Sequence, residues 1–220
     1  MTTTRAPVEV LFGEAAGAVR GIEDDFAMLE AARPCARPSA RVWECTETAV
    51  VLGVSRDLAS EIDEVECAKQ RVAVLRRASG GGTVVIGPGT LQYAIAFPHA
   101  AGAEPPSIDA VKRLCSRLVA GALAASGIEA DVDSDASGDL HVAARKVAGV
   151  SLRRRRDATL LHGTLLIDAD LARIAALLRH PAREPAWRQG RPHLAFLANL
   201  GPFDRDVFLR SLQLQVTSSQ

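Results

Sequence analysis

Hydrophobic and polar residues follow two kinds of pattern along the chain, and each predicts a different element. Short β-branched or alternating runs predict strands, whereas apolar residues at i, i+3, i+4 and i+7 predict amphipathic helices. Strands are predicted at residues 41–45, 48–54, 72–75, 83–86, 91–97, 128–132, 140–144, 146–152 and 159–167. Helices are predicted at about residues 21–32, 56–70, 107–125, 168–178 and 204–214. An extended loop is predicted at residues 180–195 and a polar turn at residues 133–138.

The order of these elements predicts one α+β domain. Most of the predicted strands are joined as hairpins, so we expect a mixed, largely antiparallel β-sheet with packed helices. Neither an internal repeat nor a low-complexity linker divides the 220 residues. We therefore expect a single domain over residues 1–220.

Composition narrows the class of protein. Hydrophobic residues make up 48% of the chain and aromatic residues only 4%, which indicates an aliphatic core. The 26 basic and 26 acidic residues give a formal net charge of zero, so nothing in the overall charge favours nucleic acid or an anionic membrane as a partner. No apolar run approaches the roughly 20 residues that span a bilayer, and residues 1–7 lack the apolar region of a signal peptide. We expect a soluble, cytoplasmic protein.

A basic, glycine-rich segment between two predicted strands is the first candidate site. Residues 76–85 read Arg-Arg-Ala-Ser-Gly-Gly-Gly-Thr-Val-Val. Each glycine would cost roughly 0.5–1 kcal/mol relative to alanine within a helix or strand, but glycines let the backbone pass very close to another molecule. Free backbone N–H groups beside two arginines suit a carboxylate or a phosphate. The alternative is a flexible hairpin connection, although such turns rarely need paired arginines.

The second candidate site spans residues 139–151. Lys146 lies between apolar residues on strand-like sequence, so its side chain either points to solvent or enters a cleft. In a cleft, the ammonium group would suit a mixed-anhydride or phosphoryl transition state, where negative charge spreads onto phosphate and carbonyl oxygens. Asp139 is either a magnesium ligand, because Mg²⁺ favours carboxylate and phosphate oxygens, or an acid at a turn or strand edge.

Two further features leave alternatives open. His162 is either a histidine whose hydrogen bonds are satisfied within a strand, which we favour, or a general base. The four arginines at residues 153–156 form either a solvated loop or a surface that attracts an acidic protein partner.

Four motifs together resemble those of the lipoate–protein ligases. Residues 76–84 resemble the RRxSGGG(A/T)V signature of that family. Residues 139–140 and 145–149 resemble its NDL…RKvsG segment, residues 162–166 its HGTLL strand, and residues 197–200 its (v/l)xNL ending. The order and spacing match over roughly residues 20–201, which makes the signal much stronger than any single motif.

The resemblance implies the catalytic-domain fold shared by biotin and lipoate ligases and octanoyltransferases, with a mixed sheet and helices on one side. It also implies a two-step reaction, in which ATP activates lipoate (or octanoate) as an acyl-adenylate and a lysine of a lipoyl domain then attacks it. The implied partners are lipoyl-domain proteins, namely acyltransferase subunits of 2-oxoacid dehydrogenases and the glycine cleavage H protein.

Carried over by motif position, these roles fall on particular residues of this chain. Lys146 would be catalytic, contacting both carboxyl and phosphate, and Asp139 would lie near Mg²⁺ and phosphate. The acyl-adenylate would be bound by Arg77, Ser79, Gly80, Gly81, Gly82, Thr83, Val84, Val85, Lys146, Gly149, His162 and Gly163.

The sequence departs from the family pattern in three places. Ile86-Gly87-Pro88-Gly89-Thr90 replaces His-Asp-x-Gly-Asn, and Gly138 replaces the Asn of NDL. The chain also ends about 20 residues after the (v/l)xNL motif, so we expect the C-terminal accessory domain of single-chain ligases to be missing or a separate subunit.

These departures keep two rival functions open. The first is an ATP-independent octanoyl or lipoyl acyltransferase; its cysteine-dependent form is disfavoured because residues 116–146 hold no cysteine, while a lysine-assisted transfer stays open. The second is a non-catalytic module with a ligase-like scaffold. Biotin ligase is less favoured, because its GRGRxGRxW-type loop is absent. The cysteines themselves, Cys35, Cys45, Cys67 and Cys115, are too widely spaced to suggest a disulfide framework or a metal site.

Overall fold

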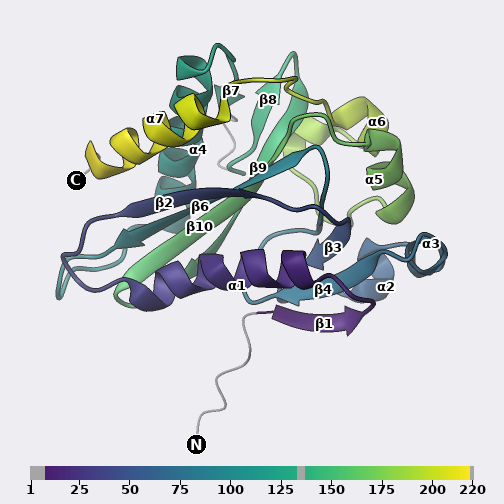
Figure 1. Cartoon of the computed structure of the whole chain (residues 1–220), viewed down its shortest axis with the longest axis horizontal. Coiled ribbons are helices and arrows are strands. Elements are labelled where there is room, and N and C mark those ends of the chain that lie inside the picture. Colours follow the sequence, from purple (N-terminus) through teal and green to yellow (C-terminus); the bar gives the residue numbers. More distant parts are fainter. Residues whose placement is uncertain (1–7, 133–136, 219–220) are drawn as a thin grey trace, which may run out of the picture.

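The computed structural model describes residues 8–132 and 137–218, and it contains two β-sheets rather than one (Figure 1). Most of the predicted polar turn, at residues 133–136, lies outside the described residues, as do residues 1–7. The larger sheet has the strand order β2-β6-β10-β9-β8-β7, and the smaller one β1-β4-β3-β5.

All strands of the six-stranded sheet pair antiparallel. They are β2 (Ser39–Glu44), β6 (Thr90–Pro98), β7 (Asp131–Val132), β8 (Leu140–Val142), β9 (Arg145–Arg154) and β10 (Ala158–Leu166). Alternate residues of β6 pack on opposite faces: Tyr93 and Ile95 share one core cluster, and Ala94 joins the other.

The four-stranded sheet is the mixed one. It contains β1 (Val8–Phe12), β3 (Ala49–Leu52), β4 (Ala73–Arg77) and β5 (Val84–Ile86). β3 and β4 are parallel and are joined by the short helices α2 (Leu58–Glu61) and α3 (Glu64–Lys69), because a parallel connection needs a crossover. β5 then turns back antiparallel to β3.

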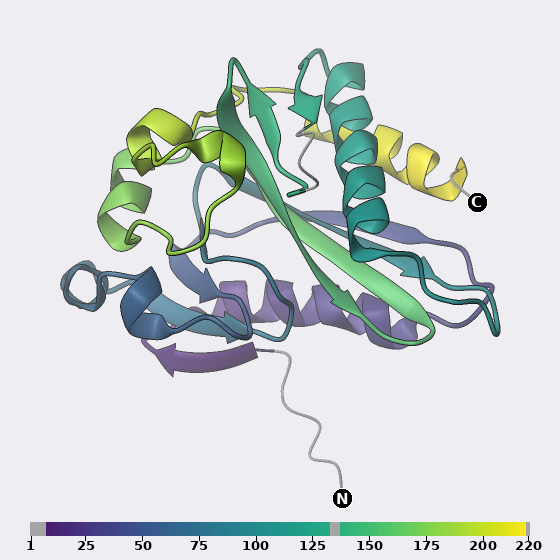
Figure 2. The same ribbon diagram turned by 180° about the vertical axis from the view of Figure 1, so that it is seen from behind.

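Helices cover both faces of the six-stranded sheet (Figures 1 and 2). Helices α4 (Ile108–Ala125) and α7 (Arg205–Ser218) pack on one face, while α1 (Ala16–Ala31) packs between the other face and the small sheet. Helices α5 (Leu171–Leu177) and α6 (His193–Phe196) cover the outer face of the small sheet. The α+β class is therefore confirmed. The expected single sheet with helices on one side is wrong, because β3 and β4 pair in a second sheet and α1 buries its apolar face between the two sheets.

Two predicted elements differ in detail. The helix expected at residues 56–70 is broken at Ile62, which is buried and pairs with Leu178, and the side chains of Asp57 and Asp63 cap the two resulting helices. The extended loop expected at residues 180–195 contains a 3₁₀ turn, Ala186–Arg188, and the start of α6, because Trp187 packs on Phe196. In the part of the chain that the structure describes, no helix combines the length and apolar character needed to cross a membrane.

Candidate active site

A cavity of about 790 Å³ is lined by residues from both sheets. Much of the lining comes from α1 with β2, from the residues between β4 and β5 (78–83, the glycine loop) with β5, from the strands β9 and β10, and from the segment 178–197. Other elements add single residues, among them Val51, Arg56, Glu61, Arg77, Gln92, Lys112 and Asp139. Residues of the candidate motifs therefore meet at one place, although they are as far apart in sequence as Arg77 and Gly163.

Most of the residues singled out in the sequence line this cavity. They are Arg77, Gly81, Gly82, Thr83, Val84, Val85, Asp139, Lys146, Gly149, His162 and Gly163. Ser79 and Gly80 do not line it: Ser79 is fully buried, and the N–H group of Gly80 donates to the carbonyl oxygen of Leu152.

Lys146 enters the cavity, which resolves the alternatives left open for it. It follows a tight turn in which Ala143 and Ala144 both have positive φ, and its Nζ lies 2.7 Å from Oδ1 of the buried Asp139. A Cβ atom at Gly149 would lie 3.0 Å from that Nζ, so glycine leaves room for the ion pair. The Lys146 side chain is still 28% exposed, and its ammonium group has donors left for a ligand.

Arg77 holds the glycine loop from within. Its Nη2 donates to the carbonyl oxygens of Gly80 and Gly82, both at 2.8 Å, its Nη1 to that of Val51 at 3.0 Å, and its Nε to Ser79 Oγ at 2.9 Å. Burial lowers the Arg77 pKa to about 10, so the guanidinium stays charged at neutral pH. With these donors used inside the protein, the geometry favours a role in shaping the loop over direct contact with a carboxylate.

The glycine loop is also held by residues that sequence reasoning assigned only to a helix. Arg56 Nε donates to the carbonyl oxygen of Gly81 at 2.9 Å, and Thr83 Oγ1 donates to Glu61 at 2.6 Å. Arg56 and Glu61 are themselves paired at 3.3 Å. Within the loop Gly81 has φ +89°, a conformation that favours glycine. Its chain neighbours aside, no described residue has an atom within 4 Å of where a Gly82 Cβ would be.

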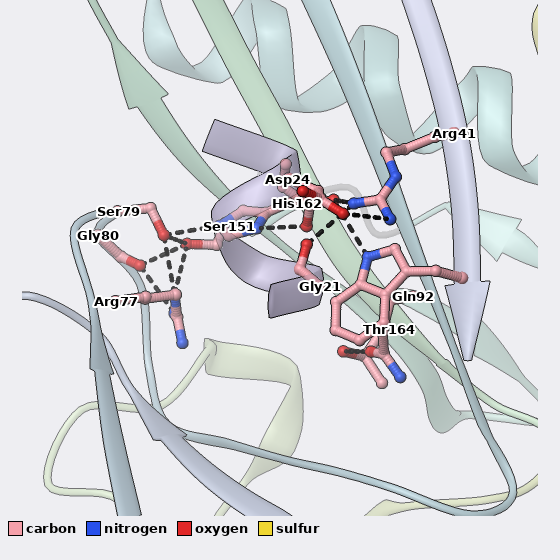
Figure 3. Close-up of polar contacts among 12 residues, drawn as sticks. Gly21, Asp24, Arg41, Arg77, Ser79, Gly80, Gln92, Ser151, His162 and Thr164 are labelled. Carbon is pink, nitrogen blue, oxygen red and sulfur yellow. Dashed lines mark hydrogen bonds and ion pairs between the residues drawn. The ribbon is translucent and has the colours of Figure 1, made fainter. Parts of the chain in front are cut away.

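His162 has both ring nitrogens engaged inside the protein (Figure 3). Nε2 lies 2.7 Å from Ser79 Oγ, Nδ1 lies 3.3 Å from Asp25 Oδ2, and Phe26 packs edge-on against the ring. The favoured interpretation, a strand histidine with satisfied hydrogen bonds, is confirmed. Asp25 was missed, because its position in the sequence indicates only the polar face of a helix.

The segment 178–197 brings unexpected basic groups to the cavity. Arg188 is buried with its guanidinium over the ring of Phe196, and its Nη2 has no hydrogen-bond partner among the described residues. His193 also lines the cavity, and burial, together with nearby Arg188, His180 and Lys146, lowers its pKa to about 4. Arg188 and His193 lie in a segment that the sequence analysis predicted to be a loop. Sequence reasoning therefore missed them as site residues, and the only signal that could have found them is their basic character.

The altered tail of the glycine motif forms a closed turn. The hydroxyl of Thr90 donates to the carbonyl oxygen of Gly87 at 2.7 Å and accepts from Gln92 Nε2 at 2.7 Å. Gln92 in turn accepts from Thr164 at 2.7 Å, and both side chains line the cavity (Figure 3). Gly138 has φ +84° and packs against Val150, which a Cβ atom would meet.

The four consecutive arginines lie exposed at the β9–β10 hairpin. Arg153 donates to the carbonyl oxygen of Ala78 and Arg154 to that of Pro106, while Arg155 pairs with Glu30 and Asp157. The exposure agrees with the solvated-loop interpretation, and the acidic partner stays a prediction.

The cysteines are free thiols, and none is an activated nucleophile in the cavity. Cys115 lies in α4, fully buried, and burial raises its pKa to about 12. Burial likewise raises the Cys67 pKa to about 11. The residues that the structure describes contain no cluster of three or more His, Cys, Asp or Glu side chains that could hold a metal ion.

Comparison with solved structures identifies the fold. A bipartite lipoate protein ligase of Thermoplasma acidophilum, described with its E2 lipoyl domain, superposes with a TM-score of 0.72 at 20% identity, covering 88% of this chain and 75% of that one. A lipoate-protein ligase A bound with ATP gives a TM-score of 0.70 at 21% identity, covering 88% of this chain and 77% of that one.

Comparison of sequences identifies the family. A protein named as a lipoate-protein ligase A in Aeropyrum pernix is 30% identical over 139 residues, which are 63% of this chain and 50% of that protein. The chain thus spans about half the length of this relative. The family model described as the lipoyl protein ligase A/B catalytic domain matches residues 24–203. The chain therefore belongs to the lipoyl protein ligase A/B catalytic domain family.

Proposed function

We propose that the protein is a lipoate-protein ligase catalytic domain, which attaches lipoate or octanoate to a lysine of a lipoyl domain through an acyl-adenylate. One observation carries the proposal: Lys146 and the glycine loop line the same cavity from separate elements. A mixed anhydride of a carboxylate and a phosphate needs a compact cation and backbone donors around a single centre, and this arrangement offers both.

In the first proposed step, a carboxylate oxygen of the acyl substrate attacks the α-phosphorus of ATP. The bond from that phosphorus to the oxygen bridging the β-phosphate breaks, and pyrophosphate leaves. The Lys146 ammonium group would offset negative charge on the carboxyl and phosphate oxygens, and Asp139 would hold the ammonium in place. Gly82, with open space beside its Cα, would let the substrate approach the backbone closely.

In the second proposed step, the amine of the acceptor lysine attacks the acyl carbon. An amide bond forms, the acyl–phosphate bond breaks, AMP leaves and the amine proton passes to solvent. The adenylate would otherwise hydrolyse, so the walls of the cavity have a second task, which is to limit access of water to the anhydride.

The residues present fit a magnesium ion that accompanies ATP. Asp139 lies on the wall of the cavity, where its Oδ1 is paired with Lys146. One carboxylate together with substrate phosphates is a usual way of binding Mg²⁺. Bound there, the ion would neutralise phosphate charge.

The proposed acceptors are lipoyl domains of 2-oxoacid dehydrogenase acyltransferase subunits and the glycine cleavage H protein. The Thermoplasma relative is a bipartite ligase described with its E2 lipoyl domain, which supports a lipoyl domain as the partner of this chain. Its bipartite nature also supports a separate accessory subunit. A cytoplasmic location, expected from the sequence, stays a prediction.

Carrier-dependent acyl transfer is the second candidate, and the buried thiols weigh against its cysteine-dependent form. Cys115 is the cysteine nearest the Lys146 segment in the sequence, and burial keeps it protonated. Family membership and the likeness to an ATP-bound ligase support the ligase over this transferase and over a non-catalytic module.

A mass measurement separates the candidates. The purified protein is given apo lipoyl domain with either lipoate and MgATP or octanoyl carrier protein, and the mass of the domain is followed. Modification that requires MgATP supports the ligase. Modification only from the carrier would favour the transferase, and binding of the domain without modification would favour the module.

A further inference from the structure

Asp25 is a buried acid in the middle of α1, with only 2% of its surface exposed. Burial of a carboxylate is costly unless it is paired and hydrogen-bonded, so its contacts require an explanation. Oδ2 lies 3.3 Å from His162 Nδ1, while Oδ1 accepts from Arg41 Nη1 at 2.7 Å and from Trp43 Nε1 at 3.1 Å. These contacts lead toward two different parts of the cavity lining.

The first path leads from Asp25 to the glycine loop. A carboxylate oxygen accepts hydrogen bonds, so we assign the hydrogen to His162 Nδ1 and the acceptor role to Nε2. The hydroxyl of Ser79 donates to that Nε2 at 2.7 Å, and Ser79 Oγ accepts from Arg77 Nε at 2.9 Å. Arg77 then holds the carbonyl oxygens of Gly80 and Gly82. Figure 3 shows this path from His162 through Ser79 to Arg77.

The second path leads from Asp25 to Trp43, which lines the cavity from β2. The Trp43 ring packs against Gly21 of α1, where a Cβ atom would meet the indole. The indole ring of Trp43 therefore fits against the backbone at Gly21, and its N–H group is held by the Asp25 carboxylate. One carboxylate therefore connects the glycine loop with Trp43.

We propose that Asp25 and His162 are positioning residues, which fix the glycine loop and Trp43 relative to each other before substrate binds. This inference rests on the proposed ligase function for its consequence in catalysis. His162 has both nitrogens engaged within the protein, so it acts through Ser79 and Arg77 and not as a base on substrate. A site whose donors are held by buried hydrogen bonds keeps the geometry that the transition state requires.

The kinetic test uses Asp25→Asn, which keeps the size of the side chain and removes its charge. Adenylate formation is measured as pyrophosphate release at 10 °C, with the folded fraction of each variant measured by circular dichroism. We expect kcat per folded molecule to fall by about 10²-fold, because small misplacements of reacting groups cause losses of that size. Glu23→Gln is the matched control, because Glu23 is a more exposed acid of the same helix. Equal kcat in Asp25→Asn and the parent would overturn the proposal.

A second pair of variants separates positioning from base catalysis. The amide of His162→Gln can still donate to Asp25 and accept from Ser79, but it cannot take a proton, whereas His162→Ala can do neither. We expect the kcat of the glutamine variant to be about 10-fold higher than that of the alanine variant. Equally inactive variants, both folded, would contradict positioning.

A third measurement does not depend on activity. Long-range ¹H–¹⁵N correlation spectra of the intact protein report which nitrogen of His162 carries the hydrogen. We expect the Nδ1–H tautomer in the parent and a shifted or mixed population in Asp25→Asn. If the parent makes no adenylate, the proposed function fails while this result still decides the network; an Nε2–H tautomer that is insensitive to Asp25→Asn overturns the network itself.

Discussion

Two walls of the cavity are built in opposite ways. Around the glycine loop, polar groups are matched within the protein: Arg77 grips the loop carbonyls, and Ser79 bonds to His162. In the segment 178–197, Arg188 has a buried Nη2 without a hydrogen-bond partner among the described residues, and His193 is held neutral. Lys146 is intermediate, paired with Asp139 but partly exposed.

The difference suggests a division of labour. A wall whose hydrogen bonds are already made is rigid, and it presents the same backbone to each substrate. A buried cation with a spare donor is incompletely satisfied, so a ligand anion improves its environment. We therefore expect changes in the first wall to affect stability and the geometry of the site, and changes at the cationic side chains to affect ligand binding and charge stabilisation.

The largest effect is expected for Lys146→Ala. Removal of a cation aimed at charge that develops in the transition state costs about 10²–10³-fold in kcat, and loss of a partly exposed side chain should leave the fold intact. Turnover is measured by the mass of the modified lipoyl domain, and the fold by circular dichroism. Lys69→Ala, at an exposed lysine of α3, is the control. Near-normal turnover of folded Lys146→Ala protein would remove the basis of the proposed function.

The next effect is expected for Arg77→Lys, and it concerns stability. A lysine keeps the charge but cannot reach both loop carbonyls and Ser79, so buried acceptors are left unpaired at about 1–3 kcal/mol each. A loss of about 3 kcal/mol corresponds to a decrease in Tm of about 6–12 °C for a chain of this size. Calorimetry measures the change, with Arg117→Lys on the exposed face of α4 as control. An unchanged Tm would mean that the hydrogen bonds from Arg77 to the loop carbonyls contribute little to the stability of the fold.

A smaller effect is expected for Arg188→Gln, and it concerns nucleotide. Loss of one charge-assisted hydrogen bond costs about 1.5 kcal/mol, and we expect the KM for ATP to rise about 10-fold with little change in kcat. Pyrophosphate release at varied ATP concentration gives both constants. Arg113→Gln, on the exposed surface of α4, serves as the matched control. A KM equal to that of the parent would show that this wall does not meet the nucleotide.

The smallest effect is expected for the pH dependence of stability. The folded-state pKa of His193, about 4, lies below its ordinary value of 6.5, so the unfolded chain takes up the proton first as pH falls. Stability should therefore decrease between about pH 6.5 and 4, and His193→Gln should lessen that decrease. Urea midpoints of parent and variant are compared across this range. Parallel pH profiles would contradict the lowered pKa.

The sequence was informative wherever a local pattern carries the signal. Most of the strand positions and the helix that begins near Ser107 follow from periodicity, which acts over a few residues, whereas the strand β1 was not predicted. The glycine motif and Lys146 were recognisable for the same reason, because each lies in a continuous stretch. Two departures followed from tertiary contacts: the break at Ile62, which pairs with the distant Leu178, and the packing of Trp187 on Phe196.

The pairings across the site could not be read from the sequence. Asp25 and His162 are 137 residues apart, and Arg56, Glu61 and Arg188 belong to segments with no motif. Nor does residue type reveal that Arg77 turns its donors inward, since an arginine beside glycines equally suits a bound anion.

The sequence by itself determined the α+β class, the likeness to the ligase family and the identity of the cation, Lys146, because these depend on local periodicity and on short continuous motifs. Only the tertiary structure decided that there are two sheets, that Asp25 connects the glycine loop with Trp43, and that Arg188 lies buried with a donor that no described residue accepts. The physical reason is that burial and hydrogen-bond partners depend on packing between distant segments. The local pattern of apolar and polar residues does not determine which of these segments come into contact.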